Sequence, residues 1–199
     1  MQKLKEEVKQ KIIDVGKHRF KAFGFENTSM KDIAGDAGIS TGNIYRYFLT
    51  KKHLLGEILD ELEVEINGLL DEISSSYSSN DLHEAFAKIT EGTVELAKKN
   101  ADTFKIMFNS QNESQFMNFK NRILDTLMMK MSFLTVQVEN NQFDKTIYEA
   151  IAHAEFEGFI HIVKNNMDDI ETLRKNLELY EELMIKDLID NMKAENQKK

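Results

Sequence analysis

A run of polar and basic residues near the N-terminus has the side-chain types that read nucleic acids. Residues 40–51 bring serine, threonine, asparagine, two tyrosines, arginine and lysine into close succession. Asn43 can donate to and accept from one base edge, with adenine as its usual partner, and Arg46 suits guanine or a phosphate. The hydroxyls of Tyr45 and Tyr47 suit phosphate oxygens. This segment therefore predicts contacts to both the bases and the backbone of double-stranded DNA.

Two short helices would position these side chains. Ser29 and Asp32 have the spacing of a capping box, which predicts a helix over about 30–37. Ser40 can cap a second helix over about 41–47, and Gly38 between the helices can adopt a positive φ. A small core would form from Ile33, Ala34, Ala37, Ile39, Ile44 and Phe48. The pattern predicts a helix-turn-helix whose second helix enters a major groove.

The charge of the chain also separates an N-terminal part from the rest. Residues 1–56 hold 11 Lys and Arg against 6 Asp and Glu, whereas residues 57–199 hold 15 against 28. The whole chain has a formal net charge of −8 at pH 7. An acidic body with a basic head can bind nucleic acid through the head.

The remaining apolar residues recur at helical spacing, and no strand pattern is visible. The chain contains no proline, so no helix needs to be interrupted by one. We predict an all-α protein of about nine helices, with a helix-turn-helix DNA-binding domain over 1–50 and a larger helical ligand-binding and dimerisation domain over 51–199. Besides the two short helices, those predicted cover about 4–23, 51–73, 82–99, 102–109, 116–138, 144–165 and 169–193.

Residues 12–55 resemble the DNA-binding domain of the TetR (tetracycline repressor) family of bacterial regulators. The resemblance rests on Phe20, GF at 24–25, TSMKDIA at 28–34, AGIS at 37–40, G-x-x-Y at 42–45, YF at 47–48 and K-x-x-L at 51–54. Gly16 departs from the usual alanine of the family, and Gly35 departs from a common polar helix former. The DNA contacts that we expect are Thr28, Ser29, Lys31, Ser40, Thr41, Gly42, Asn43, Tyr45, Arg46, Tyr47 and Lys51.

The resemblance also implies a homodimer and a small-molecule effector. The last two long helices of the family form a four-helix bundle with their mates. We assign to that interface a ridge of small residues (Ala150, Ala154, Gly158) and an apolar stripe over 170–188. An effector bound in the larger domain would release the operator by favouring the DNA-incompetent state. The expected lining is Phe86, Phe104, Met107, Phe108, Phe116, Met128, Phe133, Tyr148, Glu155, Phe156 and Phe159.

Glu155 is a carboxylate on the apolar face of the helix predicted over 144–165. Such a group needs a partner, or its pKa rises. Two interpretations remain open: it recognises a cationic or hydrogen-bonding ligand, or it lies in the dimer interface with a local partner. On the opposite face of this helix, His153, Glu157 and His161 follow one another at four-residue intervals. Three ligands along one helix give a poor tetrahedral metal site, so we expect these side chains to be solvated.

The sequence argues against several other classes of protein. It has no cysteine, no stretch long and apolar enough to span a membrane and no apolar segment of a secretory signal. It also lacks the usual nucleotide-binding and catalytic motifs. We expect a cytoplasmic bacterial regulator, a repressor released by a largely apolar effector, with no cofactor, metal or catalysis. The alternatives are a helical small-molecule-binding protein or enzyme with a vestigial helix-turn-helix, and an architectural DNA-binding protein without inducer.

Overall fold

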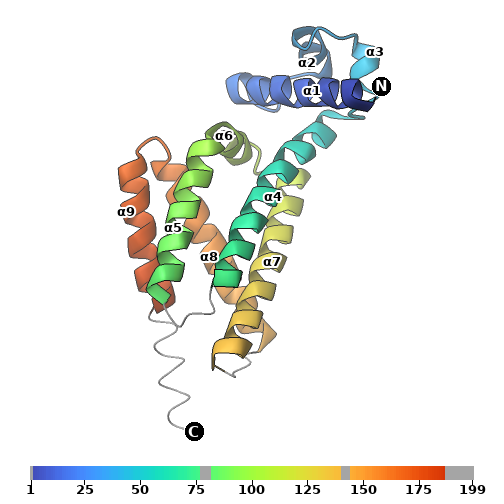
Figure 1. The fold of residues 1–199 in the computed structure, drawn as a ribbon. Coiled ribbons are helices and arrows are strands. Elements are labelled where there is room, and N and C mark those ends of the chain that lie inside the picture. The colour runs from blue at the N-terminus through green and yellow to red at the C-terminus, as the bar shows by residue number, and fades with distance from the viewer. Residues whose placement is uncertain (1, 77–81, 140–143, 187–199) are drawn as a thin grey trace. The chain divides into compact units, whose positions relative to one another are not determined.

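The computed structural model describes residues 2–76, 82–139 and 144–186. Within these ranges every regular element is a helix, which confirms the predicted all-α fold (Figure 1). None of the helices described there is long and apolar enough to cross a membrane. The helices are α1 (Gln2–Phe23), α2 (Met30–Asp36), α3 (Thr41–Ile44), α4 (Lys51–Ser76), α5 (Leu82–Lys99), α6 (Ala101–Asn109), α7 (Ser114–Glu139), α8 (Lys145–Asn166) and α9 (Ile170–Glu181), followed by a π-helix (Glu182–Lys186).

The chain divides into two compact units. Unit 1 comprises residues 1–64 and 100–120, and unit 2 comprises residues 65–99 and 121–199. Helices α1, α2, α3 and α6 belong to unit 1, whereas α5, α8 and α9 belong to unit 2. Helices α4 and α7 contribute residues to both units. The domain boundary expected between residues 50 and 51 stays a prediction.

The start of α2 has the predicted capping box. The Ser29 hydroxyl accepts a 3.2 Å hydrogen bond from the Asp32 amide, and the Ser29 amide donates one of 3.0 Å to the Asp32 carboxylate. The Ser29 hydroxyl also donates to the Asp32 carboxylate at 2.6 Å, and this bond, with the one from the Ser29 amide, lowers the pKa of Asp32 because it favours the charged form. Two glycines make the adjoining turns, Gly24 after α1 with φ +81° and Gly38 after α2 with φ +67°. Both lie in the left-handed region, which favours glycine.

Helix α3 is shorter than predicted. Its N-cap is Ser40, whose hydroxyl accepts a 3.2 Å hydrogen bond from the Asn43 amide. The helix ends at Ile44, and residues 45–47 continue as turns instead of helix. There the Arg46 amide bonds the Asn43 carbonyl at 3.1 Å, a bond across three residues that tightens the end of the helix.

The core of unit 1 holds α2 and α3 against α1 and the start of α4. Ile12, Phe20, Ile33, Ile44 and Phe48 are each at most 1% exposed, and of the apolar core predicted for the helix-turn-helix only Ile39 is half-buried. The packing of α4 on α1 explains why residue 16 is a glycine instead of the alanine that is usual in the family. A Cβ at Gly16 would lie 2.8 Å from Cδ2 of Leu54, so the glycine lets α4 approach α1 closely.

In unit 2, α9 packs on α5 and α8. Leu173 and Leu177 of α9 are fully buried within the single chain. A Cβ at Gly158 on α8 would lie 2.7 Å from Cε2 of Tyr180. The chain's own helices therefore cover Leu173 and Leu177, which corrects their assignment to a dimer interface, whereas Ala150 and Ala154 of the ridge are exposed and their place in an interface stays a prediction. The helix predicted over 169–193 ends at Glu181 before the π-helix, and residues beyond 186 lie outside the described ranges.

Candidate nucleic-acid interface

The polar residues around α3 lie on the side of the helix away from the core. Ile44 and Phe48 are fully buried and hold the segment onto the domain. Thr41 and Arg46 are exposed, Tyr45 is 45% exposed, and Asn43 and Tyr47 are half-buried. Ser40 and Gly42 are exposed as well, and a Cβ at Gly42 would meet no atom of the chain within 4 Å. The helix-turn-helix thus presents the expected base- and phosphate-contacting groups to its surroundings.

The residues expected to contact DNA before α3 divide between exposed and buried positions. Ser29 and Lys31 are exposed at the start of α2. Thr28 is 3% exposed, and its hydroxyl donates hydrogen bonds to the carbonyl oxygens of Gly24 at 2.9 Å and Arg19 at 3.4 Å. The Thr28 hydroxyl therefore holds the turn after α1 from inside the domain.

Lys51 links the start of α4 to the same turn. Its ammonium donates to the carbonyl oxygens of Phe25 at 2.5 Å and Glu26 at 3.2 Å. It also lies 4.3 Å from the centroid of the Phe25 ring, within the range of a cation–π contact. Lys51 is half-buried. It thus positions the turn between α1 and α2, and the phosphate contact expected of it stays a prediction.

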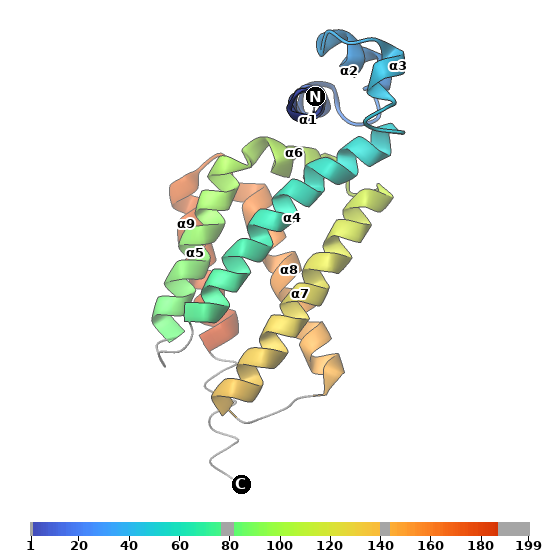
Figure 2. The same cartoon turned by 45° about the vertical axis from the view of Figure 1, so that its right-hand side comes forward.

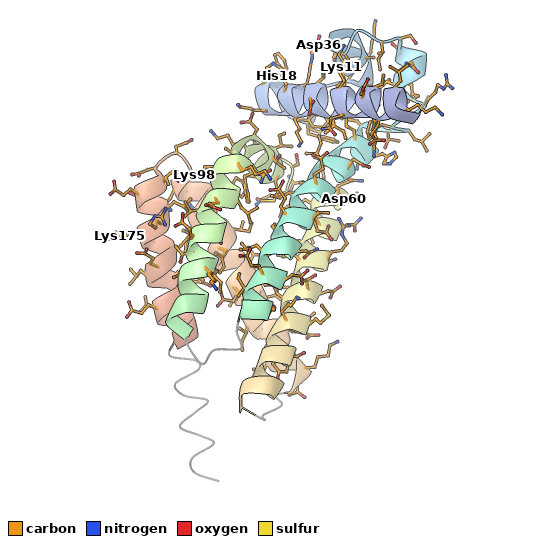
Figure 3. All side chains as sticks on the ribbon, in the orientation of Figure 1. Lys11, His18, Asp36, Asp60, Lys98 and Lys175 are labelled. Carbon is orange, nitrogen blue, oxygen red and sulfur yellow. The ribbon has the colours of Figure 1, made fainter. Side chains whose placement is uncertain are left out.

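One acidic residue of α2, Asp36, is neutralised by a local partner. The Arg19 guanidinium bonds the Asp36 carboxylate at 2.5 Å and thereby lowers the pKa of that carboxyl. Figure 3 shows Asp36 beside α1, the helix that carries Lys11 and His18. Within the described residues, Lys31 and Arg46 form no ion pair. These two cations therefore stay available for phosphates.

The residues expected to line an effector pocket do not gather in one unit. Phe104, Met107, Phe108 and Phe116 belong to unit 1, where all but the half-buried Phe108 are at most 6% exposed. The other candidates belong to unit 2, where Tyr148 and Phe156 are buried and Met128 and Phe159 are half-buried. Phe86 and Phe133 lie outside the residues whose side chains are described. A common effector site for this set stays a prediction.

Glu155 is buried in unit 2 beside a second acid that sequence reasoning missed. Glu155 on α8 is 7% exposed and Glu181 on α9 is 2% exposed. The Glu181 carboxylate accepts a 2.8 Å hydrogen bond from the Thr90 hydroxyl of α5. Glu181 follows Leu173 and Leu177 at four-residue intervals, so the apolar periodicity of α9 already contained the signal for a buried carboxyl. Since Glu155 is covered within one chain, it does not need a second chain to bury it.

The histidine-bearing stripe of α8 faces solvent, as predicted. His153, Glu157 and His161 are all exposed. In the described ranges no group of three histidine, cysteine, aspartate or glutamate side chains is arranged to hold a metal ion.

The helix-turn-helix and its flanking helices match a known family. Residues 12–58 match the family described as bacterial regulatory proteins, tetR family. The HTH-type transcriptional regulator AcrR of Shigella flexneri is 33% identical over 92 residues, which are 45% of this chain and 43% of that protein. Over residues 12–58 this chain is therefore similar to the tetR family. The matched segment thus spans less than half the length of AcrR.

Solved tetR-family structures share the fold over nearly the whole chain. A TetR-family transcriptional regulator from Syntrophomonas wolfei has a TM-score of 0.69 at 21% identity, covering 91% of this chain and 96% of that one. SmeT, the repressor of the Stenotrophomonas maltophilia multidrug efflux pump SmeDEF, has a TM-score of 0.68 at 16% identity over 89% and 88%. The likeness beyond the helix-turn-helix is therefore one of fold.

Proposed function

We propose that this protein is a ligand-responsive, DNA-binding transcriptional regulator of the tetR family. It represses transcription until a small, largely apolar effector releases it from its operator. The observation that carries the proposal is the helix-turn-helix, in which Ile33, Ile44 and Phe48 are fully buried. On the same element Thr41, Tyr45 and Arg46 remain exposed. The protein acts in the cytoplasm, without catalysis, metal or cofactor.

The charge distribution supports DNA as the partner. The head carries a net positive charge on an acidic chain. The carboxylate of Asp36 is paired with Arg19, whereas Lys31 and Arg46 have no ion-pair partner in the described part of the chain. Phosphate contacts release counterions, so DNA binding should weaken steeply as salt rises.

The family fold supports a homodimer and an effector. TetR-family regulators bind operators and act as dimers, and two heads related by a two-fold axis read a pseudo-palindromic site. Exposed apolar residues of unit 2 on α8 and α9, among them Ile147 and Leu179, offer surface for a second chain. An effector relieves repression only to the extent that it binds the released state more tightly than the DNA-bound state.

A selection from random-sequence DNA duplexes tests the proposal. The full chain is mixed with the duplexes at about 0.15 M salt, a near-physiological ionic strength, and the retained fraction is sequenced. Enrichment of a palindromic site supports the regulator. Retention without sequence preference would instead indicate an architectural protein. No retention would overturn DNA binding and leave the helical body as the working part.

A further inference from the structure

Three helices of unit 2 bring polar side chains together inside an apolar layer. Helices α5, α8 and α9 lie side by side in both views of the ribbon (Figures 1 and 2). They contribute Thr90, Glu155 and Glu181, which are at most 7% exposed. Lys98 and Lys175, on α5 and α9, are exposed (Figure 3). We call Thr90, Glu155 and Glu181 the buried acidic cluster.

The hydrogen-bonding capacity of the buried acidic cluster is only partly used. Thr90 donates to one oxygen of Glu181 at 2.8 Å. The other oxygen of Glu181, Oε1, and Oε2 of Glu155 are buried without any hydrogen-bond partner. Neither carboxyl forms an ion pair with a residue whose side chain is described. Tyr180, next to Glu181, donates a hydrogen bond to the carbonyl of Ala154, next to Glu155, so both carboxyls lie at the same contact between α8 and α9, and Glu155 raises the pKa of Glu181.

Two unpartnered carboxyl oxygens in a protein interior are costly. A buried acceptor without a donor loses its hydration and gains nothing in return, and a buried charge without a counter-charge costs more. Either protons or a cation must therefore compensate the pair.

We propose that the buried acidic cluster recognises the ammonium group of an organic cation, with Glu155 and Glu181 accepting its N–H hydrogen bonds. The proposal rests on the proposed function, because this cation would be the effector or part of it. It specifies the largely apolar effector as an amphipathic one, which carries an ammonium head on an apolar body. An effector with a carboxylate head would be repelled at this place.

The aromatic residues beside the pair favour an organic cation. Phe159 lies four residues after Glu155 on α8, and its ring meets the Tyr180 ring edge to face at a centroid distance of 5.6 Å. The Tyr180 hydroxyl donates to the Ala154 carbonyl at 2.8 Å, so its proton is not directed at Glu155. Aromatic faces attract ammonium groups, and they add apolar surface for the rest of the ligand.

The donor set argues against a divalent metal. Calcium takes six to eight oxygen ligands, whereas the cluster offers two carboxylates and one hydroxyl. Among the described residues no third acid or histidine completes a metal-binding group here. An ammonium group needs only the few acceptors that the cluster leaves free.

The acid–base properties of the pair provide a signature of cation binding. Burial raises the pKa of Glu155 to about 7 and that of Glu181 to about 8. Glu178 of α9 also raises the pKa of Glu181. Tyr180 stays protonated because burial and the charge of Glu155 raise its pKa to about 12. From α5 the described contact is the neutral Thr90 hydroxyl. A bound ammonium group favours the ionised carboxylates, so its binding releases protons near neutral pH.

The test compares three probes that share a chain and differ in the head group. Decylammonium, decanol and decanoate are titrated calorimetrically into the full chain near pH 8, below micelle-forming concentrations, together with their six-carbon counterparts. We expect at least one ammonium probe to bind at least about tenfold more tightly than the alcohol and the carboxylate of equal length, about 1.4 kcal/mol. If no ammonium probe binds, or if the alcohols bind as tightly, the proposal is wrong.

Variants of the pair connect binding to these residues. E155Q and E181Q keep the side-chain shape and remove the charge, so each should weaken ammonium binding at least about tenfold, whereas E157Q at an exposed position of α8 should bind unchanged. If a variant fails to fold, proton release by the unaltered chain still tests the proposal. Titrations in two buffers of different ionisation enthalpy should show proton release on binding near pH 7, and binding without it overturns the proposal.

DNA binding separates this inference from the proposed function. E155Q and E181Q should still bind the selected operator, because neither residue belongs to the helix-turn-helix. If operator binding is intact but ammonium probes neither bind nor release the DNA, the inference fails and the regulator stands. If no operator is selected at all, the proposed function fails whatever the probes do.

Discussion

Tyr180 lies so close over Gly158 that no side chain fits between α9 and α8. A Cβ at Gly158 would come within 2.7 Å of Cε2 of the ring, and the Tyr180 hydroxyl donates to the Ala154 carbonyl at 2.8 Å. The glycine thus allows the aromatic ring to join the two helices beside Glu155. This contact explains why a small residue is needed there within a single chain.

Gly158→Ala should destabilise unit 2. The added methyl group must displace the Tyr180 ring and its hydrogen bond, at a cost of about 1–3 kcal/mol, typical of overpacking. Denaturant unfolding followed by circular dichroism measures the change. Gly68→Ala is the matched control, because a Cβ there would meet no atom within 4 Å and alanine favours a helix by up to about 1 kcal/mol. Equal effects of the two substitutions would contradict the packing argument.

The stability of the protein should respond to the buried acidic cluster as pH changes. Both carboxyl pKa values are raised in the folded state, so the folded chain binds more protons than the unfolded chain between about pH 4.5 and 8. The contribution of the pair to the free energy of unfolding therefore falls as pH rises through this range. At about pH 9, E181Q should be more stable than the unaltered chain by at least about 1 kcal/mol, given 1.4 kcal/mol per unit of pKa shift.

Unfolding at a series of pH values in E155Q, E181Q and the unaltered chain measures this effect. Comparison between variants removes the contributions of Asp32, Asp36, Asp144 and Asp169, whose lowered pKa values act at acidic pH. Parallel pH profiles for all three proteins would show that the carboxyls titrate normally.

Gly42→Ala should weaken DNA binding without loss of stability. A Cβ at this position would meet no atom of the chain, so the fold does not require a glycine there. DNA that lies close to α3 would require one, because a Cβ would separate the helix from it. We expect at least about a tenfold loss of operator affinity, about 1.4 kcal/mol. Gly35→Ala on α2 is the control, because its Cβ also meets no atom and the site is outside α3. Unchanged operator affinity in Gly42→Ala would place the DNA elsewhere.

Substitution of Asn43 and of Tyr45 should remove different kinds of DNA contact. Asn43→Ala should relax specificity at one base pair, by about 1–3 kcal/mol of discrimination, because it removes a base-edge contact. Tyr45→Ala should weaken binding to all sequences by a similar factor, because a phosphate contact carries no sequence information. Titration of a panel of operator variants distinguishes the two patterns, and identical patterns would refute the assignment.

Lys51→Ala should lower both stability and DNA affinity. The carbonyl oxygens of Phe25 and Glu26 lose a charged donor, at a cost of about 1–3 kcal/mol. Loss of one phosphate contact should also reduce the salt slope of DNA binding by about 1. The neighbouring Lys52→Ala is the control for stability, because Lys52 is exposed and pairs with Glu113 instead of the carbonyl groups of that turn. An unchanged salt slope in Lys51→Ala would restrict Lys51 to its structural contact.

The sequence by itself determined the features that depend on local spacing. The capping box at Ser29, the turn at Gly38 and the buried faces around Ile44 follow from interactions within a few residues, so they could be predicted. The exposed polar positions of the helix-turn-helix followed from the same periodicity. Thr28 and Lys51 are exceptions, since their side chains donate to backbone carbonyl groups that a linear pattern does not show.

Only the tertiary structure decided which distant faces meet. The pairing of Glu155 with Glu181, the seat of Tyr180 over Gly158 and the contact of Lys51 with the carbonyl of Phe25 join residues about 20 or more positions apart. Helical periodicity specifies that a face is buried but not which helix covers it. For that reason the sequence predicts that Gly158 meets a second chain, although Tyr180 of α9 packs on it, and it predicts Glu155 without its acidic neighbour.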